Sequence, residues 1–374
     1  MNIGIVCYPT YGGSGIVATE LGSELAKLDH KVHFISYALP TRLDRFQNNV
    51  YYHDVEFPHY ALFDHQLYTL ALAGKIIDVV KYEKIDILHV HYAIPHAVSG
   101  FLAKNILMDT QHVKLVTTLH GTDITLVGLE PAFHPIVKYS LDQSDAVTAV
   151  SNYLAEKTVQ NFNPNKKIEV IYNFIDHDFY SRHDTFNLKQ KIAPNGEKIL
   201  IHISNFRPVK RVADTIKILH QILKKHPAKL LLVGDGPDRT ECENLARELK
   251  IDCHVRFLGK QTSIVELLSI ADLFLLPSQS ESFGLSALEA MSCCVPVIAS
   301  NIGGIPEVVA HGETGFVAEL GDVERMARYA ISLFDNPKKM EAFSENSRKK
   351  AIEKFDSNII VPKYVELYER VLNS

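Results

Sequence analysis

The sequence predicts an α/β protein built from two doubly wound, Rossmann-like domains. Short, fully apolar runs alternate with amphipathic helical patterns along the whole chain. Such runs are typical of parallel strands that are buried on both faces and joined by helices. The chain has 374 residues, and at about 150 residues per domain this length favours two domains.

The first half of the chain contains six of these apolar runs. They predict strands at Ile3–Cys7, Val32–Ser36, Ile87–Val90, Leu115–Leu119, Ala146–Val150 and Ile168–Tyr172. Helical patterns lie between several of them, including Ile16–Leu28 and Ile136–Gln143. The apolar stretch Leu67–Val80 contains Lys75 and Asp78, so we interpret it as a core-facing helix and not as a membrane span.

The second half shows the same alternation of strand and helix patterns, but its sequence does not repeat that of the first half. Its predicted strands are Ile199–Ile203, Leu230–Val233, Val255–Leu258, Leu273–Leu276, Val297–Ala299 and Phe316–Ala318. Its predicted helices are Val212–Lys225, Arg239–Leu249, Ile264–Ile270 and Leu285–Met291. The similarity of the two halves is therefore one of architecture.

Regular patterning lapses at Asn173–Asp184, where we place a hinge between domains at residues 1–172 and 173–356. The last apolar helix, Ile359–Leu372, follows the second domain's pattern. We expect the segment 357–374 to close the second domain or to cross back to the first. Ligands bind outside the carboxyl ends of parallel strands, so two facing sheets predict a cleft that holds a nucleotide on one side and a second substrate on the other.

Composition narrows the class of protein. The chain is 46% hydrophobic and 22% charged, which rules out disorder as its main state. The sequence pI of about 6.4 argues against nonspecific nucleic-acid binding. Residues 1–170 contain 13 Lys+Arg and 17 Asp+Glu, a net −4 of the total −5. We therefore expect neither nucleic acid nor an anionic membrane surface as a partner.

Cysteine usage and the start of the chain favour a cytoplasmic protein. The five cysteines include no C-x-x-C pair, which is typical of a reducing compartment. Met1-Asn2 leads directly into a strand pattern, so we expect no signal peptide.

Glycine and histidine motifs follow strands of the first half. Gly12-Gly13-Ser14-Gly15, preceded by Tyr11, lies between the first strand and a helix, where backbone N–H groups can approach an anion. A tight structural turn explains the same residues equally well. His120 follows a predicted strand and should face the cleft. His89 and His91 lie on one face of a strand, but no further ligand accompanies them, so we predict no metal site.

The second half contains a basic turn and a pair of spaced glutamates. Asn205–Arg211 follows a strand and includes Arg207 and Lys210, cations that can neutralise a diphosphate. Glu281 and Glu289 are eight residues apart, and a helix is predicted to begin near Gly284. The first N–H groups of that helix would point toward a phosphate or a sugar. Two glycine segments, Gly234–Pro237 and Gly303–Glu307, are interpreted mainly as turns and scaffold.

These elements, in this order, resemble the retaining glycosyltransferases of family 4, which have the GT-B fold. The E-x7-E element Glu281–Glu289 carries the resemblance, with the Gly12-Gly13 loop, the basic turn and both glycine segments. The resemblance implies transfer of a sugar from a nucleotide diphosphate donor, with retention at the anomeric carbon and without a metal or other cofactor. It also carries the expectation of a homodimer.

Further stretches resemble the subfamily that joins N-acetylglucosamine to L-malate in bacillithiol biosynthesis. They are Leu88–Ala97, Thr117–Thr125, Tyr172–Asp176 and His202–Val212. The resemblance implies UDP-N-acetylglucosamine as donor and the 2-hydroxyl of L-malate as acceptor. It assigns donor binding to the C-terminal domain and acceptor binding to the N-terminal domain.

Carried over residue by residue, the resemblance implies the following site. Catalytic roles fall to His120, Arg207, Lys210 and Glu281. Donor contacts fall to Gly13, Ser282, Phe283, Gly284, Leu285 and Glu289. Acceptor contacts fall to Ser14, Tyr92, Thr118 and Asn152. One departure is that the family commonly has Arg five residues before the diphosphate Lys, where this chain has Asn205, so Arg207 would supply the second cation.

Three alternatives remain open at this point. A family 4 enzyme acting on a lipid or a polysaccharide shares the donor motifs, although the acidic first half favours a small acceptor. A UDP-sugar epimerase can share the architecture and would need no acceptor. A sensor that binds the nucleotide sugar without turnover would retain the same glutamates and basic turn.

Overall fold

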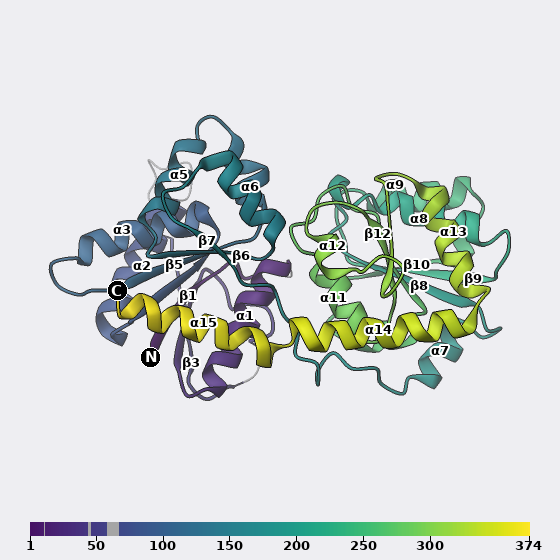
Figure 1. Ribbon diagram of the computed structural model, residues 1–374, viewed down its shortest axis with the longest axis horizontal. Helices are drawn as coiled ribbons and strands as arrows, with labels where there is room; N and C mark the ends of the chain where they lie inside the picture. The colour runs from purple at the N-terminus through teal and green to yellow at the C-terminus, as the bar shows by residue number, and fades with distance from the viewer. Residues whose placement is uncertain (11, 44–45, 58–66) are drawn as a thin grey trace. The chain divides into compact units, whose positions relative to one another are not determined.

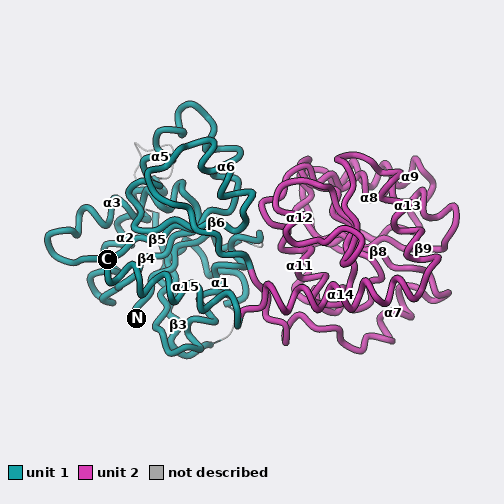
Figure 2. The backbone as a smooth tube through the Cα atoms, viewed as in Figure 1, with its two compact units in different colours: residues 1–173, 358–374 teal, residues 174–357 magenta. Residues whose placement is uncertain are grey.

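The computed structural model describes residues 1–10, 12–43, 46–57 and 67–374. Tyr11, next to the predicted glycine loop, lies outside the described residues. The chain divides into two compact units (Figure 2), unit 1 with residues 1–173 and 358–374 and unit 2 with residues 174–357. Both are parallel sheets flanked by helices (Figure 1), so the predicted fold class is confirmed.

Unit 1 contains a seven-stranded sheet in the order β3-β2-β1-β4-β5-β6-β7. The strands are β1 (Asn2–Val6), β2 (Lys31–Ser36), β3 (Val50–Asp54), β4 (Ile87–His91), β5 (Lys114–Leu119), β6 (Ala146–Ala149) and β7 (Ile168–Val170). The helices are α1 (Gly13–Lys27), α2 (Tyr68–Glu83), α3 (Val98–Leu107), α4 (Thr122–Thr125), α5 (His134–Gln143) and α6 (Asn152–Phe162). The strand order reverses between β1 and β4, which is where ligands bind in doubly wound sheets.

Unit 2 contains a six-stranded sheet in the order β10-β9-β8-β11-β12-β13. The strands are β8 (Lys198–Ile203), β9 (Ala228–Val233), β10 (Val255–Gly259), β11 (Leu273–Leu276), β12 (Val297–Ser300) and β13 (Gly315–Ala318). The helices are α7 (Phe186–Ile192), α8 (Val212–Ile222), α9 (Arg239–Glu248), α10 (Ile264–Ile270), α11 (Leu285–Ser292), α12 (Ile305–Val308), α13 (Val323–Phe334) and α14 (Pro337–Phe355). Here the order reverses between β8 and β11.

The central strands form the core because both of their faces are covered. All five residues of β4 and all four residues of β11 are buried, as the apolar runs predict. The edge strand β3 is different, because none of its five residues is buried. The sequence analysis did not predict β3, since it lacks the apolar run that identifies a central strand.

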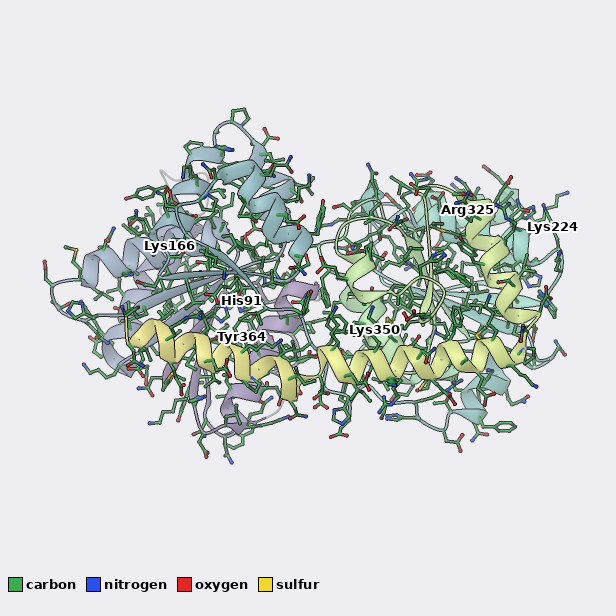
Figure 3. All side chains as sticks on the ribbon, in the orientation of Figure 1. His91, Lys166, Lys224, Arg325, Lys350 and Tyr364 are labelled. Carbon is green, nitrogen blue, oxygen red and sulfur yellow. The ribbon has the colours of Figure 1, made fainter. Side chains whose placement is uncertain are left out.

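The chain passes between the units twice, and the two passages are hydrogen-bonded to each other within unit 2. The Ile175 N–H donates to the Phe355 carbonyl at 3.0 Å, and the Ser357 N–H donates to the Ile175 carbonyl at 2.9 Å. Helix α15 (Ser357–Leu372) begins at this point. Its residues from Asn358 onward belong to unit 1, and Tyr364 projects from it (Figure 3).

Within the described residues, no helix has both the length and the apolar character needed to cross a membrane. The predicted core-facing helix is α2, which buries Leu72, Ile76 and Val80.

Candidate active site

Four neighbouring strands of unit 1 are each followed by a predicted site residue. Ser14 follows β1, Tyr92 follows β4, His120 follows β5 and Asn152 follows β6. The carboxyl ends of parallel strands meet at one edge of a sheet. The fold therefore brings these four positions to the same edge, and Gly13 lies there too as the exposed first residue of α1.

Ser14 and Tyr92 are in direct contact. The Tyr92 hydroxyl donates to Ser14 Oγ at 2.7 Å, so a residue from the glycine loop and one from the end of β4 form a single polar surface. Tyr92 has a φ of 91°, a left-handed conformation that is uncommon for a non-glycine residue. Asn152, the first residue of α6, donates from Nδ2 to the Tyr172 hydroxyl at 2.7 Å.

His120 is held by a second histidine. His91 Nδ1 and His120 Nε2 are 2.8 Å apart, and their rings stack. Burial lowers the pKa of His120 to about 3, so the ring is neutral at pH 7. One ring nitrogen can then donate a hydrogen bond, and the other can accept one. His91 is itself fully buried, and burial holds its pKa well below the usual range.

The neighbouring histidine, His89, is hydrogen-bonded to two hydroxyl groups. Its Nδ1 lies 2.7 Å from the Tyr368 hydroxyl of α15, and its Nε2 lies 2.7 Å from Thr118 Oγ1. The rings of His89 and His91 stack at 4.6 Å, as expected for two residues on one strand face. Both nitrogens of His89 thus have protein partners without a metal ion.

Thr118 is the predicted acceptor residue that lies deepest. It is completely buried, and its hydroxyl is shared with His89 and with Thr148 Oγ1 at 2.6 Å. These contacts indicate that Thr118 stabilises the ends of the strands from inside unit 1. Its direct contact with an acceptor stays a prediction.

Asp123 ties together the segments that carry Tyr92 and His120. Its carboxylate accepts the Ala93 N–H at 2.7 Å and the Gly121 N–H at 3.1 Å. Burial raises the pKa of this carboxyl to about 6. The matching stretch Thr117–Thr125 includes Asp123, but the sequence alone did not reveal this positioning role.

In unit 2, the basic turn and the first glutamate meet. Lys210 Nζ donates to Glu281 Oε1 at 2.6 Å, and Ser278 Oγ donates to the same oxygen at 3.0 Å. Lys210 lies in the turn after β8, and Glu281 lies in the loop after β11. These strands are neighbours at the reversal of strand order, so the site forms where the topology predicts a ligand.

Arg207 begins the same turn. Its backbone carbonyl accepts the Lys210 N–H at 2.8 Å, and its side chain is exposed. Asn205, which replaces the family arginine, is also exposed. The turn thus presents Arg207 to solvent, while Lys210 is half-buried against Glu281.

Helix α11 begins where the sequence predicts. Gly284 is its N-cap with a φ of 99°, a left-handed conformation that favours glycine. Leu285, the first helical residue, and Ser282 are partly buried. Phe283 is buried and packs edge-to-face on Phe355 at 5.5 Å, so any ligand contact of Phe283 would come from its backbone.

Glu289 is buried on α11 rather than exposed. The Tyr180 hydroxyl donates to Glu289 Oε1 at 2.6 Å, and Glu289 is 4% exposed. Tyr180 lies 109 residues earlier in the segment after the predicted hinge. No local pattern points to it, so sequence analysis missed this partner.

The glycine pair after β12 supports the Glu281 loop. The Gly304 N–H donates to the Glu281 carbonyl at 3.0 Å. Gly303 has a φ of 56°, and a Cβ there would lie 1.9 Å from the Glu281 carbonyl oxygen. This close backbone approach supports the interpretation of Gly303–Glu307 as scaffold. It also shows that the scaffold acts on a predicted catalytic residue.

Comparisons with known proteins identify the family of the chain. Residues 11–179 match the family described as Glycosyltransferase Family 4, and residues 184–350 match the family described as Glycosyl transferases group 1. The N-acetyl-alpha-D-glucosaminyl L-malate synthase of Bacillus anthracis is 47% identical over 373 residues, which cover 100% of this chain and 97% of that protein.

Solved structures match the fold over the whole chain. The Anabaena HepE protein in complex with UDP-glucose has a TM-score of 0.86 at 22% identity and covers 99% of this chain and 100% of its own. The sucrose-phosphate synthase of Thermosynechococcus elongatus has a TM-score of 0.82 at 20% identity and covers 100% of this chain and 99% of its own.

Proposed function

This chain belongs to glycosyltransferase family 4, and we propose that it transfers N-acetylglucosamine from UDP-N-acetylglucosamine to the 2-hydroxyl of L-malate. The observation that carries the proposal is the 47% identity, over the full chain, to an N-acetyl-alpha-D-glucosaminyl L-malate synthase. The reaction would be the first step of bacillithiol biosynthesis, with retention at the anomeric carbon.

We assign donor binding to unit 2. Glu289 would accept hydrogen bonds from the ribose hydroxyls, and its burial beside Tyr180 fixes its carboxylate in one orientation. The N–H groups at Gly284 and Leu285 would approach the diphosphate, because the first N–H groups of a helix lack intrahelical acceptors. Glu281 would contact the sugar hydroxyls.

The pairing of Lys210 with Glu281 supports a role at the diphosphate. A lysine with a carboxylate partner 2.6 Å away is held in place before the donor arrives, and an anionic diphosphate would then share or displace that partner. Arg207, on the exposed side of the same turn, would supply the second cation. Two cations there would offset the charge of the UDP leaving group.

We assign acceptor binding to unit 1. Ser14, Tyr92 and Asn152 would donate to the malate carboxylates from the carboxyl edge of the sheet. The net −4 of residues 1–170 means that bulk charge cannot attract a dianion, so these local donors would have to bind it. His120, kept neutral by burial, would touch the donor sugar near its 6-hydroxyl.

The proposed step is attack on the same face of the sugar through an oxocarbenium-like transition state. The bond from the anomeric carbon to the UDP oxygen breaks, and a bond to the malate 2-oxygen forms. The malate hydroxyl proton passes to the departing phosphate oxygen. Double displacement would need a carboxylate nucleophile, and Glu281 is already hydrogen-bonded to Lys210 and Ser278.

The experiment is a mass-resolved assay with UDP-N-acetylglucosamine and a panel of hydroxy acids. The proposal predicts UDP release that depends on L-malate, together with a product of the mass of N-acetylglucosaminyl malate. An epimerase would leave UDP attached to the epimerised sugar and would form no malate product. A transferase with a lipid or polysaccharide acceptor would leave malate unmodified, and a sensor would release no UDP; each of these results would contradict the proposal.

A further inference from the structure

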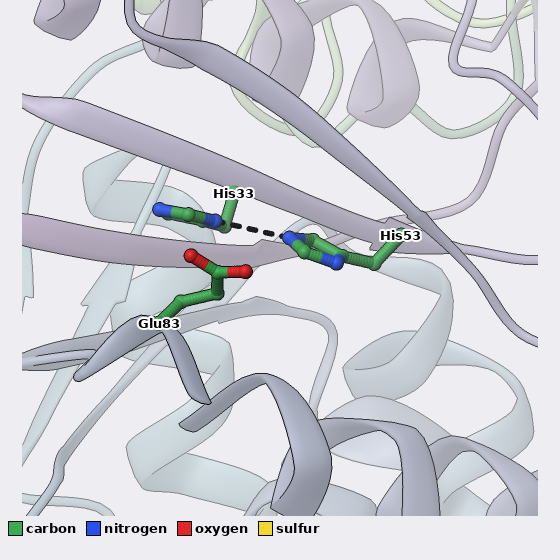
Figure 4. A group of neighbouring side chains, drawn as sticks. All are labelled: His33, His53 and Glu83. Atoms are coloured by element: carbon green, nitrogen blue, oxygen red, sulfur yellow. Dashed lines mark hydrogen bonds between the residues drawn. The ribbon is translucent and has the colours of Figure 1, made fainter. Parts of the chain in front are cut away.

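A second cluster of polar side chains lies in unit 1, away from the carboxyl edge of the sheet. His33 lies in the middle of β2, His53 lies on the edge strand β3, and Glu83 is the last residue of α2 (Figure 4). His33 Nδ1 and His53 Nε2 are 3.0 Å apart, and the rings stack at 5.2 Å. One ligand atom from each of the three residues lies within 4.8 Å of the others.

His33 brings a buried imidazole to this cluster, since it is only 2% exposed. Its Nδ1 has the His53 ring as its partner at 3.0 Å, and an ion bound between the two rings would take the place of that hydrogen bond. Among the residues that the structure describes, this is the one group of three His, Cys, Asp or Glu side chains with convergent ligand atoms.

The cluster combines two imidazoles with one carboxylate, and transition metals such as zinc accept both kinds of ligand. Glu83 adds one negative charge from the exposed end of α2.

We propose that His33, His53 and Glu83 bind a divalent transition-metal ion such as Zn²⁺. Two histidines and one carboxylate are a ligand set that zinc uses in proteins, with a water in the fourth position. Zinc–nitrogen bonds of about 2.0–2.1 Å in a tetrahedral site place two ligand nitrogens about 3.3 Å apart. The two histidine nitrogens would therefore separate by only a few tenths of an ångström, and the exposed Glu83 leaves an entry path from solvent.

Such an ion would fasten the edge of the sheet. It would join β2, β3 and the end of α2, and it would reinforce a strand that has no buried residue and is attached to the sheet by its pairing with β2. The ion would stabilise the folded chain, because a ligand that binds only the native state shifts the folding equilibrium by mass action. The cluster lies beside the strands and not beyond their carboxyl ends, so the role is structural and independent of the proposed transfer reaction.

The test is a titration of the chelator-treated full chain with Zn²⁺ by calorimetry, and with Co²⁺ by visible absorption. We expect one saturable site per chain, with ligand-field bands for Co²⁺ that indicate tetrahedral coordination. Glu83→Gln should weaken Zn²⁺ binding by at least about tenfold, and His53→Gln should abolish the Co²⁺ bands. At the same concentration, Zn²⁺ should raise the melting temperature of the wild-type protein more than that of Glu83→Gln.

Two controls separate this site from general metal binding. Asp78→Asn removes one exposed carboxylate from the same helix and should bind Zn²⁺ like the wild type. His30→Gln removes a histidine whose Nδ1 lies 3.3 Å from the Met1 amine and should also leave the site intact. The proposal fails if the wild type shows no stoichiometric site, or if Glu83→Gln and His53→Gln bind as tightly as the controls.

Discussion

At the scale of the residue, the contact between Lys210 and Glu281 determines how unit 2 would meet an anionic donor. The side chains are 21% and 13% exposed, so water screens their attraction less than on an open surface. A diphosphate that approaches Lys210 would compete with a carboxylate already in place. The ion pair therefore orients Lys210 and would also oppose binding of the proposed donor.

Replacing Lys210 with Ala should lower kcat by about 10²–10³, because stabilisation of the leaving group is lost at the transition state. Circular dichroism should remain unchanged, since the side chain is not part of the core. The matched control is Lys224→Ala, which removes an exposed lysine beyond α8 (Figure 3) and should keep wild-type turnover. Near-normal turnover of Lys210→Ala would remove this residue from the mechanism.

Replacing Glu281 with Gln should separate binding from turnover. The amide oxygen can still accept from Ser278, but Lys210 loses its charged partner. UDP should therefore bind more tightly in calorimetry, while kcat should fall because the contact to the sugar is altered. Weaker UDP binding by this variant would show that Glu281 does not restrain Lys210.

Contacts within the candidate site were predictable only where local motifs point to the residues involved, and the roles of these residues stay predictions. The E-x7-E spacing and the basic turn led to Lys210 and Glu281, which the structure brings together. Tyr180 could not be predicted as the partner of Glu289, because 109 residues separate them and only the folded chain joins them. His91 was predicted on the correct strand face, but its contact with His120 depends on the pairing of β4 with β5.

At the scale of the element, short glycine segments set the backbone around the predicted donor site. The turn at Gly303–Gly304 packs against the carbonyl of Glu281, so the position of the Glu281 loop depends on this turn. Through this contact, a residue without any side chain controls the position of a predicted catalytic residue.

Replacing Gly303 with Ala should displace the Glu281 loop and reduce activity and stability together. The new Cβ would meet the Glu281 carbonyl at 1.9 Å in addition to the unfavourable φ of 56°. Backbone strain alone costs about 1–3 kcal/mol. The control is Gly312→Ala, where φ is 82° but no atom lies within 4 Å. Melting temperature and kcat should both fall more for Gly303→Ala, and equal effects would refute the steric coupling.

Most elements of the fold were predictable, because the central strands are short apolar runs and the helices between them have amphipathic patterns. Every predicted strand has an observed counterpart that differs by a few residues at most. One observed strand, β3 (Val50–Asp54), was not predicted. Its sequence shows no alternation of apolar and polar residues, and none of its residues is fully buried. An edge strand of this kind is specified by pairing with β2 and not by its own pattern.

At the scale of the whole molecule, buried neutral histidines make stability depend on pH. Burial lowers the pKa of His89 to about 3 and those of His96 and His202 to about 4. The unfolded chain has histidine pKa values near 6.5. Between those limits the unfolded state binds more protons, so stability falls as the pH falls.

The folded chain should therefore be less stable at pH 5 than at pH 7. Each histidine contributes up to about 1.4 kcal/mol per pH unit below pH 6.5. Asp123 opposes the trend, because its raised pKa of about 6 means that the folded state binds the extra proton. Urea unfolding at both pH values measures the net effect, and His202→Gln should show a smaller dependence on pH. Equal midpoints at pH 5 and pH 7 would contradict the account.

The central claim is transfer of N-acetylglucosamine to L-malate with retention. Proton NMR of a reaction containing only this protein, UDP-N-acetylglucosamine and L-malate tests it most directly. The account predicts that UDP and an α-linked N-acetylglucosaminyl malate accumulate in equal amounts, with the sugar on the 2-oxygen. A β-linked product, a free or epimerised sugar, or unchanged malate would contradict it.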